Sequence, residues 1–93
     1  MSVEVRVTAV LQRVVGGAKS VSADGRTVAD VLNDLEGHYP GFKSQVLSDD
    51  GQLHRFVNIY KNDEDIRYLS QLGTEVDTGD VLSILPALAG GER

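Results

Sequence analysis

Cysteine is absent from this chain of 93 residues. Without a thiol the protein can form no disulfide, no thiolate site for zinc or an iron–sulfur cluster, and no cysteine nucleophile. Any part that it plays in sulfur chemistry must therefore use a group other than a cysteine side chain.

Positive charge and long apolar runs are also scarce. Nine basic residues against fourteen acidic ones give a net charge of -5, the wrong sign for binding the phosphates of nucleic acid. The longest apolar stretch, residues 81–89, contains Ser83 and Pro86 and is far shorter than the roughly 20 residues of a membrane-spanning helix. Glu4 and Arg6 interrupt the apolar segment that a signal peptide would need. We therefore expect a soluble cytoplasmic protein that binds neither nucleic acid nor membrane.

The remaining composition is that of a small globular protein. Hydrophobic residues make up 41% of the chain, and its length suits a single domain. Alternating apolar and polar residues over 2–11 predict a first strand. Gly16 and Gly17 break this pattern, and a second apolar run follows at 19–23. The two segments predict an antiparallel hairpin with a loose connection.

The spacing of apolar residues becomes helical after residue 27. Four of them form one stripe: Val28, Val31, Leu32 and Leu35. Thr27 is the expected N-cap, and Asp30 lies in the first turn, where a carboxylate meets the positive end of the helix dipole. Gly37 and Pro40 are expected to end this helix, and a short second helical turn follows from Phe42.

Strands return in the second half of the chain. Residues 56–61 predict a strand, Asn62 and Asp63 a turn, residues 66–67 a short extended piece, and residues 81–85 the last strand. This order predicts an α+β fold of the ubiquitin-like β-grasp type, with a mixed sheet of four to five strands and one main helix on one face. Residues 1–86 form the expected domain, and residues 87–93 a flexible C-terminal tail.

The C-terminal sequence LPALAGGER carries a specific resemblance. A last strand followed by Leu-Pro-Ala-Leu-Ala-Gly-Gly resembles the ThiS/MoaD family of ubiquitin-like sulfur carrier proteins. Within that family, LHRFVNIYKNDEDI at 53–66 and GDVLSILPALAGG at 79–91 are most similar to the CysO-type carriers of actinobacteria. The resemblance covers nearly the whole chain.

This resemblance implies a function for the end of the chain. Gly91 would be adenylated with ATP by a ubiquitin-activating-type adenylating and sulfurtransferase enzyme, and then converted to a thiocarboxylate. Leu88, Ala89 and Gly90 would thread into the partner. Glu92 and Arg93 follow the diglycine, and a JAMM-type metalloprotease would remove them first. The protein would then be a carrier without a catalytic side chain, a metal or a tightly bound cofactor, rather than an enzyme.

The destination of the sulfur stays open at this point. Similarity to the CysO type implies cysteine biosynthesis, with transfer on a PLP-dependent cysteine synthase. Thiamin, molybdopterin and thiosugar pathways use the same carrier chemistry. A ubiquitin-like modifier, joined through Gly91 to a lysine, is an alternative of another class, as is a non-covalent interaction module with an ordinary glycine-containing end.

Other candidate residues carry weaker signals. Phe56 and Tyr60 alternate with Val57 and Ile59, so they are expected on the open face of the sheet, as partner contacts or covered by neighbouring segments. The acidic group Asp63, Glu64 and Asp65 does not fit a calcium-binding loop, which favours a solvated turn. Neither histidine, His38 nor His54, has a second ligand at metal-binding spacing, and both are expected to be surface or packing residues.

Overall fold

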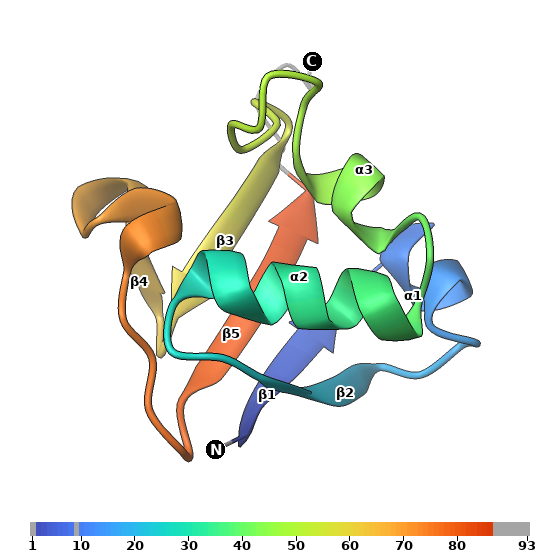
Figure 1. Ribbon diagram of the computed structural model, residues 1–93, viewed down its shortest axis with the longest axis horizontal. Helices are drawn as coiled ribbons and strands as arrows, with labels where there is room; N and C mark the ends of the chain where they lie inside the picture. The colour runs from blue at the N-terminus through green and yellow to red at the C-terminus, as the bar shows by residue number, and fades with distance from the viewer. Residues whose placement is uncertain (1, 9, 87–93) are drawn as a thin grey trace.

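The computed structural model describes residues 2–8 and 10–86. It contains one five-stranded sheet in the order β2-β1-β5-β3-β4, with α2 lying across one face (Figure 1). The elements in chain order are β1 (Ser2–Val7), α1 (Val10–Val14), β2 (Ser20–Asp24), α2 (Val28–His38), α3 (Phe42–Val46), β3 (Val57–Lys61), β4 (Glu64–Asp65), the 3-10 turns η1 (Ile66–Tyr68) and η2 (Gln71–Gly73), and β5 (Val81–Pro86).

The sheet is mixed. β1 and β5 pair in parallel at its centre, and the other three pairings are antiparallel. A parallel pair needs a long crossover connection, and residues 8–80 supply it with α2 packed on the sheet. This is the β-grasp architecture that the sequence predicts. No helix in the described part of the chain is long and apolar enough to span a bilayer.

The main helix begins and ends where the sequence predicts. The backbone N–H of Asp30 donates to Oγ1 of Thr27 over 3.1 Å, which satisfies one of the free donors of the first turn. The backbone N–H of Tyr39 donates to the carbonyl of Leu35 and closes the C-terminus. The predicted short helix is α3, and the backbone N–H groups of Gly41, its N-cap, and of Lys43 donate to the carboxylate of Glu36.

The core lies between α2 and the covered face of the sheet. Alternate residues of β1 and β5 and the central residue of β3, Ile59, are buried there, and the apolar stripe of α2 packs against them. The largest fully buried side chains are Phe42, Leu32, Leu35, Ile59, Ile66, Leu82 and Ile84. Because this burial supplies most of the driving force for folding, it fixes which residues of the strands remain on the open face.

The prediction of a first strand over 2–11 is wrong beyond Val7. The chain instead turns into α1, in which the N–H of Leu11 donates to the carbonyl of Thr8 and the side-chain amide of Gln12 donates to that of Val7. Leu11 and Val15 are both buried, and their spacing of four fits one helical face. A short apolar run fits both the period of a strand and that of a helix. The packing of Leu11 and Val15 into the core selects the helix.

The extended piece predicted at 66–67 is also wrong. The short strand β4 lies two residues earlier, where Glu64 and Asp65 pair with Lys61 and Tyr60. Ile66 then begins η1 with its side chain fully buried. The turn predicted at 62–63 is confirmed, since both residues adopt positive φ. Two of the three residues expected in a solvated turn therefore form an edge strand.

Candidate functional site

The residues predicted to carry the chemistry lie outside the described part of the chain. They are Leu88, Ala89, Gly90, Gly91, Glu92 and Arg93. What the structure describes is the place from which the chain continues toward them, namely the last residues of β5. We call the end of the sheet where Val57 faces Pro86 the exit end.

Strand pairing at the exit end accommodates a proline. Pro86 faces Val57 and Leu85 faces Asn58. The N–H of Asn62 donates to the carbonyl of Val81, and hydrogen-bonded and non-bonded pairs alternate along an antiparallel ladder. Asn58 and Leu85 are therefore a bonded pair, whereas Val57 and Pro86 are not. Pro86, which has no N–H, costs this ladder no hydrogen bond.

The last two residues of β5 have support on one side. The parallel pairing of β1 with β5 ends at Val7 and Ile84, because the chain then turns into α1. In the part of the chain that the structure describes, Leu85 and Pro86 pair with β3 alone. The geometry of the exit end therefore depends on the first two residues of β3.

An aromatic and basic cluster lies directly before β3. The side chain of Phe56 is 49% exposed. Its ring lies 5.5 Å from the ring of His54, and the guanidinium carbon of Arg55 lies 5.0 Å from its centre. The N–H of Phe56 donates to Nδ1 of His54 over 3.1 Å. Phe56 is thus exposed at the exit end, but it lies in the turn before β3 rather than in the strand where it was expected. His54, expected to be a surface or packing residue, packs against its ring.

Tyr60 occupies a different position. It is half-buried, is the last residue but one of β3, and faces Ser83 on one side and Asp65 on the other. Phe56 precedes the first pair of the ladder, so the structure does not join these two aromatic residues in one patch. Their role as partner contacts stays a prediction, with Phe56 the more accessible of the two.

Leu85 is a surface residue that the sequence analysis missed. It is 37% exposed, because Leu82 and Ile84 take the covered face and alternation puts Leu85 on the open one. It borders a groove of about 410 Å³, whose other lining residues include Arg6, Lys19 and Thr8. Alternation with the buried positions of β5 was the signal that could have identified it.

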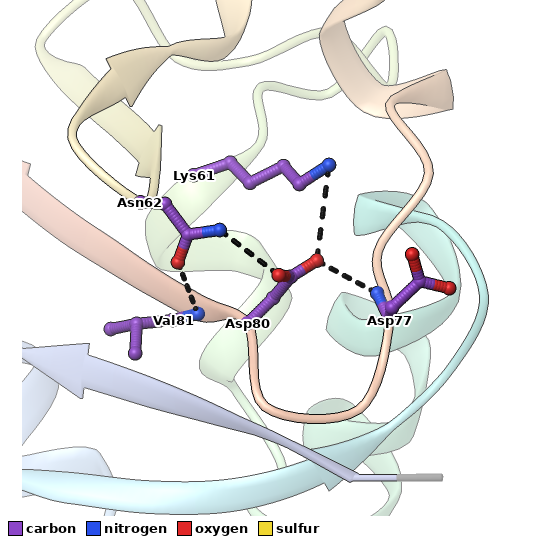
Figure 2. A network of polar contacts seen from close by, with 5 residues as sticks. All are labelled: Lys61, Asn62, Asp77, Asp80 and Val81. Carbon is purple, nitrogen blue, oxygen red and sulfur yellow. Dashed lines mark hydrogen bonds and ion pairs between the residues drawn. The ribbon is translucent and has the colours of Figure 1, made fainter.

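The other end of the β3–β5 pair is a network of polar contacts (Figure 2). We call it the closed end. The carboxylate of Asp80 accepts from the side-chain amide of Asn62 over 2.9 Å and from the N–H of Asp77 over 2.8 Å. Lys61 lies 3.8 Å from the same carboxylate, and the side-chain carbonyl of Asn62 accepts from the N–H of Val81.

These contacts stabilise the ionised form of Asp80. The hydrogen bonds from Asp77 and Asn62, with the charge of Lys61, hold the pKa of the Asp80 carboxyl below its ordinary value of 3.8. These contacts join the end of β3 to the turn before β5, so we describe the closed end as a structural site.

Within the described residues, no three His, Cys, Asp or Glu side chains are grouped as metal ligands would be. The acidic residues after β3 have different roles. Asp65 caps η1 by accepting a hydrogen bond from the N–H of Arg67, whereas Asp63 lies in the turn. His38 bonds within its own helix.

The sequence pattern of the ThiS family matches residues 5–91, from the middle of β1 to the second glycine of the diglycine. The chain belongs to the ThiS family. This membership agrees with the fold and with the position of β5.

Individual ThiS-family relatives match almost end to end. The sulfur carrier protein CysO of Mycobacterium tuberculosis is 48% identical over 93 residues, which cover 98% of this chain and all of that protein. The Small archaeal modifier protein 3 of Haloferax volcanii is 37% identical, again over 98% of this chain and all of the relative.

A solved structure confirms the fold of this ThiS-family chain. CysO in the crystal structure of the Amycolatopsis orientalis BexX/CysO complex superposes with a TM-score of 0.88 at 45% identity, covering 96% of this chain and 99% of that one. That CysO was solved bound to another protein. The ubiquitin-like β-grasp prediction is therefore confirmed.

Proposed function

We propose that this protein is a sulfur carrier that bears sulfur as a thiocarboxylate on Gly91. The observation that carries the proposal is the end-to-end likeness to CysO, together with a family match that stops at Gly91 and leaves Glu92 and Arg93 outside it. The absence of cysteine agrees with it, because a C-terminal thiocarboxylate requires no side-chain thiol.

The chemistry takes place in two steps on the C-terminal carboxylate. One of its oxygens attacks the α-phosphate of ATP, pyrophosphate leaves, and an acyl-adenylate forms. Sulfide then attacks the acyl carbon, AMP leaves with the bonding electrons, and the thiocarboxylate remains. Gly90 and Gly91 suit this role because glycine, lacking Cβ, allows close approach of the backbone to an enzyme site. The carrier is a co-substrate, and the enzymes supply the catalytic groups.

Processing must precede activation while Glu92 and Arg93 are present. A JAMM-type metalloprotease hydrolyses the Gly91–Glu92 peptide bond, and water supplies the oxygen of the new carboxylate. The activating enzyme and the protease both have to reach the residues that follow Pro86. We assign the docking of these partners to the exit end, where Phe56 and Leu85 present apolar surface beside the last strand.

Cysteine biosynthesis in the cytoplasm is the destination that we propose for the sulfur. It follows the likeness to the CysO carriers, with a PLP-dependent cysteine synthase as the acceptor enzyme. The same thiocarboxylate would serve a thiamin, molybdopterin or thiosugar pathway, and only the acceptor enzyme would change.

A second candidate function is protein modification. The 37% identity to the Small archaeal modifier protein 3 supports it. In that case an amine, rather than sulfide, attacks the activated Gly91 carbonyl, and an isopeptide bond to a lysine results. Adenylation of Gly91 is common to both functions, and the attacking group distinguishes them.

Activation of Gly91 can be tested by ATP–pyrophosphate exchange with the cognate activating enzyme. A chain ending at Gly91 should support exchange, whereas the full chain should not until the protease is added. Gly91→Val in the shortened chain should abolish exchange and leave the thermal unfolding curve unchanged. Absence of exchange with the shortened chain would contradict the proposal.

The attacking group can then be identified on a denaturing gel of the complete reaction. A carrier yields a free thiocarboxylate, which mass analysis of the isolated chain detects. A modifier yields a ladder of conjugates that resists thiol reductants. The ladder without the thiocarboxylate would favour the second function.

A further inference from the structure

The outer edge of β3 is only partly covered by a strand. In the described part of the chain, β4 pairs with Tyr60 and Lys61, which lie toward the closed end. Val57 and Asn58, at the exit end, extend beyond β4. Because Val57 is in a non-bonded pair with Pro86, its own N–H and C=O turn outward, away from β5. An uncovered strand edge of this kind needs other hydrogen-bond partners.

The side chain of Arg67 occupies that position. Its Nη2 donates to the carbonyl oxygen of Val57 over 2.8 Å, and its Nη1 donates to Oδ1 of Asn58. The outward N–H of Val57 donates to the carbonyl of His54. One guanidinium thus bonds both of the residues with which β3 begins.

Arg67 is itself held in place by η1, which lies beside β4 in the orange segment of Figure 1. Its backbone N–H donates to Oδ1 of Asp65 over 2.9 Å, and its Nη1 lies 3.9 Å from the other carboxylate oxygen of Asp65. The preceding residue, Ile66, is fully buried. The guanidinium therefore extends from an anchored turn.

A continuous set of contacts leads from Arg67 to the end of the last strand. Arg67 bonds Val57 and Asn58, and these residues face Pro86 and Leu85. We propose that Arg67 is a positioning residue, which holds the start of β3 and thereby fixes the direction in which the chain leaves β5 toward Gly91. This inference rests on the proposed function, since that direction matters when a partner enzyme has to receive the C-terminus.

The geometry requires an arginine. Two acceptors on neighbouring residues match the fork of a guanidinium, whereas the ammonium group of a lysine is a single point with a different reach. The contacts lie at the surface of the sheet, away from the core, so their loss should change local order at the exit end more than the global stability.

Amide hydrogen exchange measures this local order directly. In Arg67→Ala the amide of Leu85, which is bonded to Asn58, should exchange about tenfold faster, as expected for the loss of a charge-assisted hydrogen bond. The amide of Ser83, opposite Tyr60 and backed by β4, is the internal reference and should not change. Arg26→Ala is the matched control, because the side chain of Arg26 is exposed ahead of α2, and in the described structure only its backbone makes hydrogen bonds.

Steady-state adenylation tests the consequence for function. With the chain ending at Gly91, Arg67→Ala should raise KM about tenfold and leave kcat unchanged, because the reacting groups are the same once the C-terminus is bound. Arg67→Lys, which retains the charge, should give an intermediate KM. Asn58→Ala removes one of the two acceptors and should give a similar intermediate result.

Unchanged exchange of the Leu85 amide in Arg67→Ala would overturn the positioning role, as would a loss in kcat with KM unaltered. If the unaltered chain ending at Gly91 is not adenylated at all, the proposed function fails. The exchange comparison between Arg67→Ala and Arg26→Ala then decides alone whether Arg67 holds the end of β5.

Discussion

The two ends of the β3–β5 pair are built differently. At the closed end, Asp80 and Asn62 join the two strands and the preceding turn through side-chain and backbone hydrogen bonds (Figure 2). At the exit end, Arg67 holds the outside of β3, and the apolar side chains of Phe56 and Leu85 remain exposed.

Under the proposed function, this difference separates stability from recognition within one small sheet. At the closed end, side-chain and backbone polar groups bond to one another across the β3–β5 pair. The exit end keeps apolar and cationic side chains available beside the strand that leads to the diglycine. Its local order depends on few contacts, which suits a segment that enzymes have to receive.

Ile59→Ala should have the largest effect on stability and should not distinguish the two ends. Ile59 lies between them on β3, faces Ile84, and is fully buried. Removing its side chain leaves a cavity in the core, and the expected loss in the free energy of unfolding is about 2–5 kcal/mol. Urea denaturation measures it. A loss in the free energy of unfolding below about 1 kcal/mol would show that Ile59 is not packed in the core as described.

Asp80→Asn should destabilise the protein by about 1–3 kcal/mol, because it removes a charged acceptor of two hydrogen bonds and the partner of Lys61. Asp77→Asn is the matched control, since Asp77 contributes its backbone N–H to the network (Figure 2). Neither variant should alter adenylation of the chain ending at Gly91. Equal stability of the two variants would show that the contacts of the Asp80 carboxylate do not stabilise the closed end.

The contribution of Asp80 should depend on pH. Its pKa is lowered in the folded protein, so the stabilisation is complete above the unfolded-state pKa and is lost as the pH falls through the folded-state pKa. The stability gap between the unaltered protein and Asp80→Asn should be constant from neutral pH to about pH 5 and then narrow in more acidic solution. Glu36 and Asp50, whose pKa values are also lowered by hydrogen bonds, are present in both proteins and cancel. A gap that widens toward acid would contradict the assignment.

Phe56→Ala should have the smallest effect on stability, within about 0.5 kcal/mol, because the ring is half exposed. Binding to the activating enzyme should weaken about tenfold, as for an aromatic contact in an interface. Tyr68→Ala is the control, since Tyr68 is the more exposed residue but lies on η1. Calorimetric titration compares the two. Equal binding by both variants would remove Phe56 from the docking surface.

The sequence predicts the fold well where one signal dominates. The helix from Val28 to His38 follows from its apolar stripe and the cap at Thr27, both confirmed. The pattern predicts too long a first strand because residues 7–11 fit both the strand and the helix period, and the burial of Leu11 with Val15 selects a helix. The local sequence pattern alone does not determine which of the two structures packs better in the folded protein.

The residues of the candidate site also differ in whether the sequence predicts them. The sequence marks Gly91 through the diglycine and its resemblance to known carriers, and it marks Phe56 through strand alternation. It does not mark Arg67, because the contacts of that residue with Val57 and Asn58 span about ten residues and exist only once β4 and η1 have formed. A residue that acts by contacting a distant strand can be identified only from the structure.

The proposed conversion of Gly91 to a thiocarboxylate can be tested by the intact mass of the protein isolated from its native host under sulfur-replete growth. We expect a species that ends at Gly91 and is heavier by the exchange of one oxygen for sulfur. A chain that keeps Glu92 and Arg93, with no shortened form even when the protease and activating enzyme are present, would contradict it.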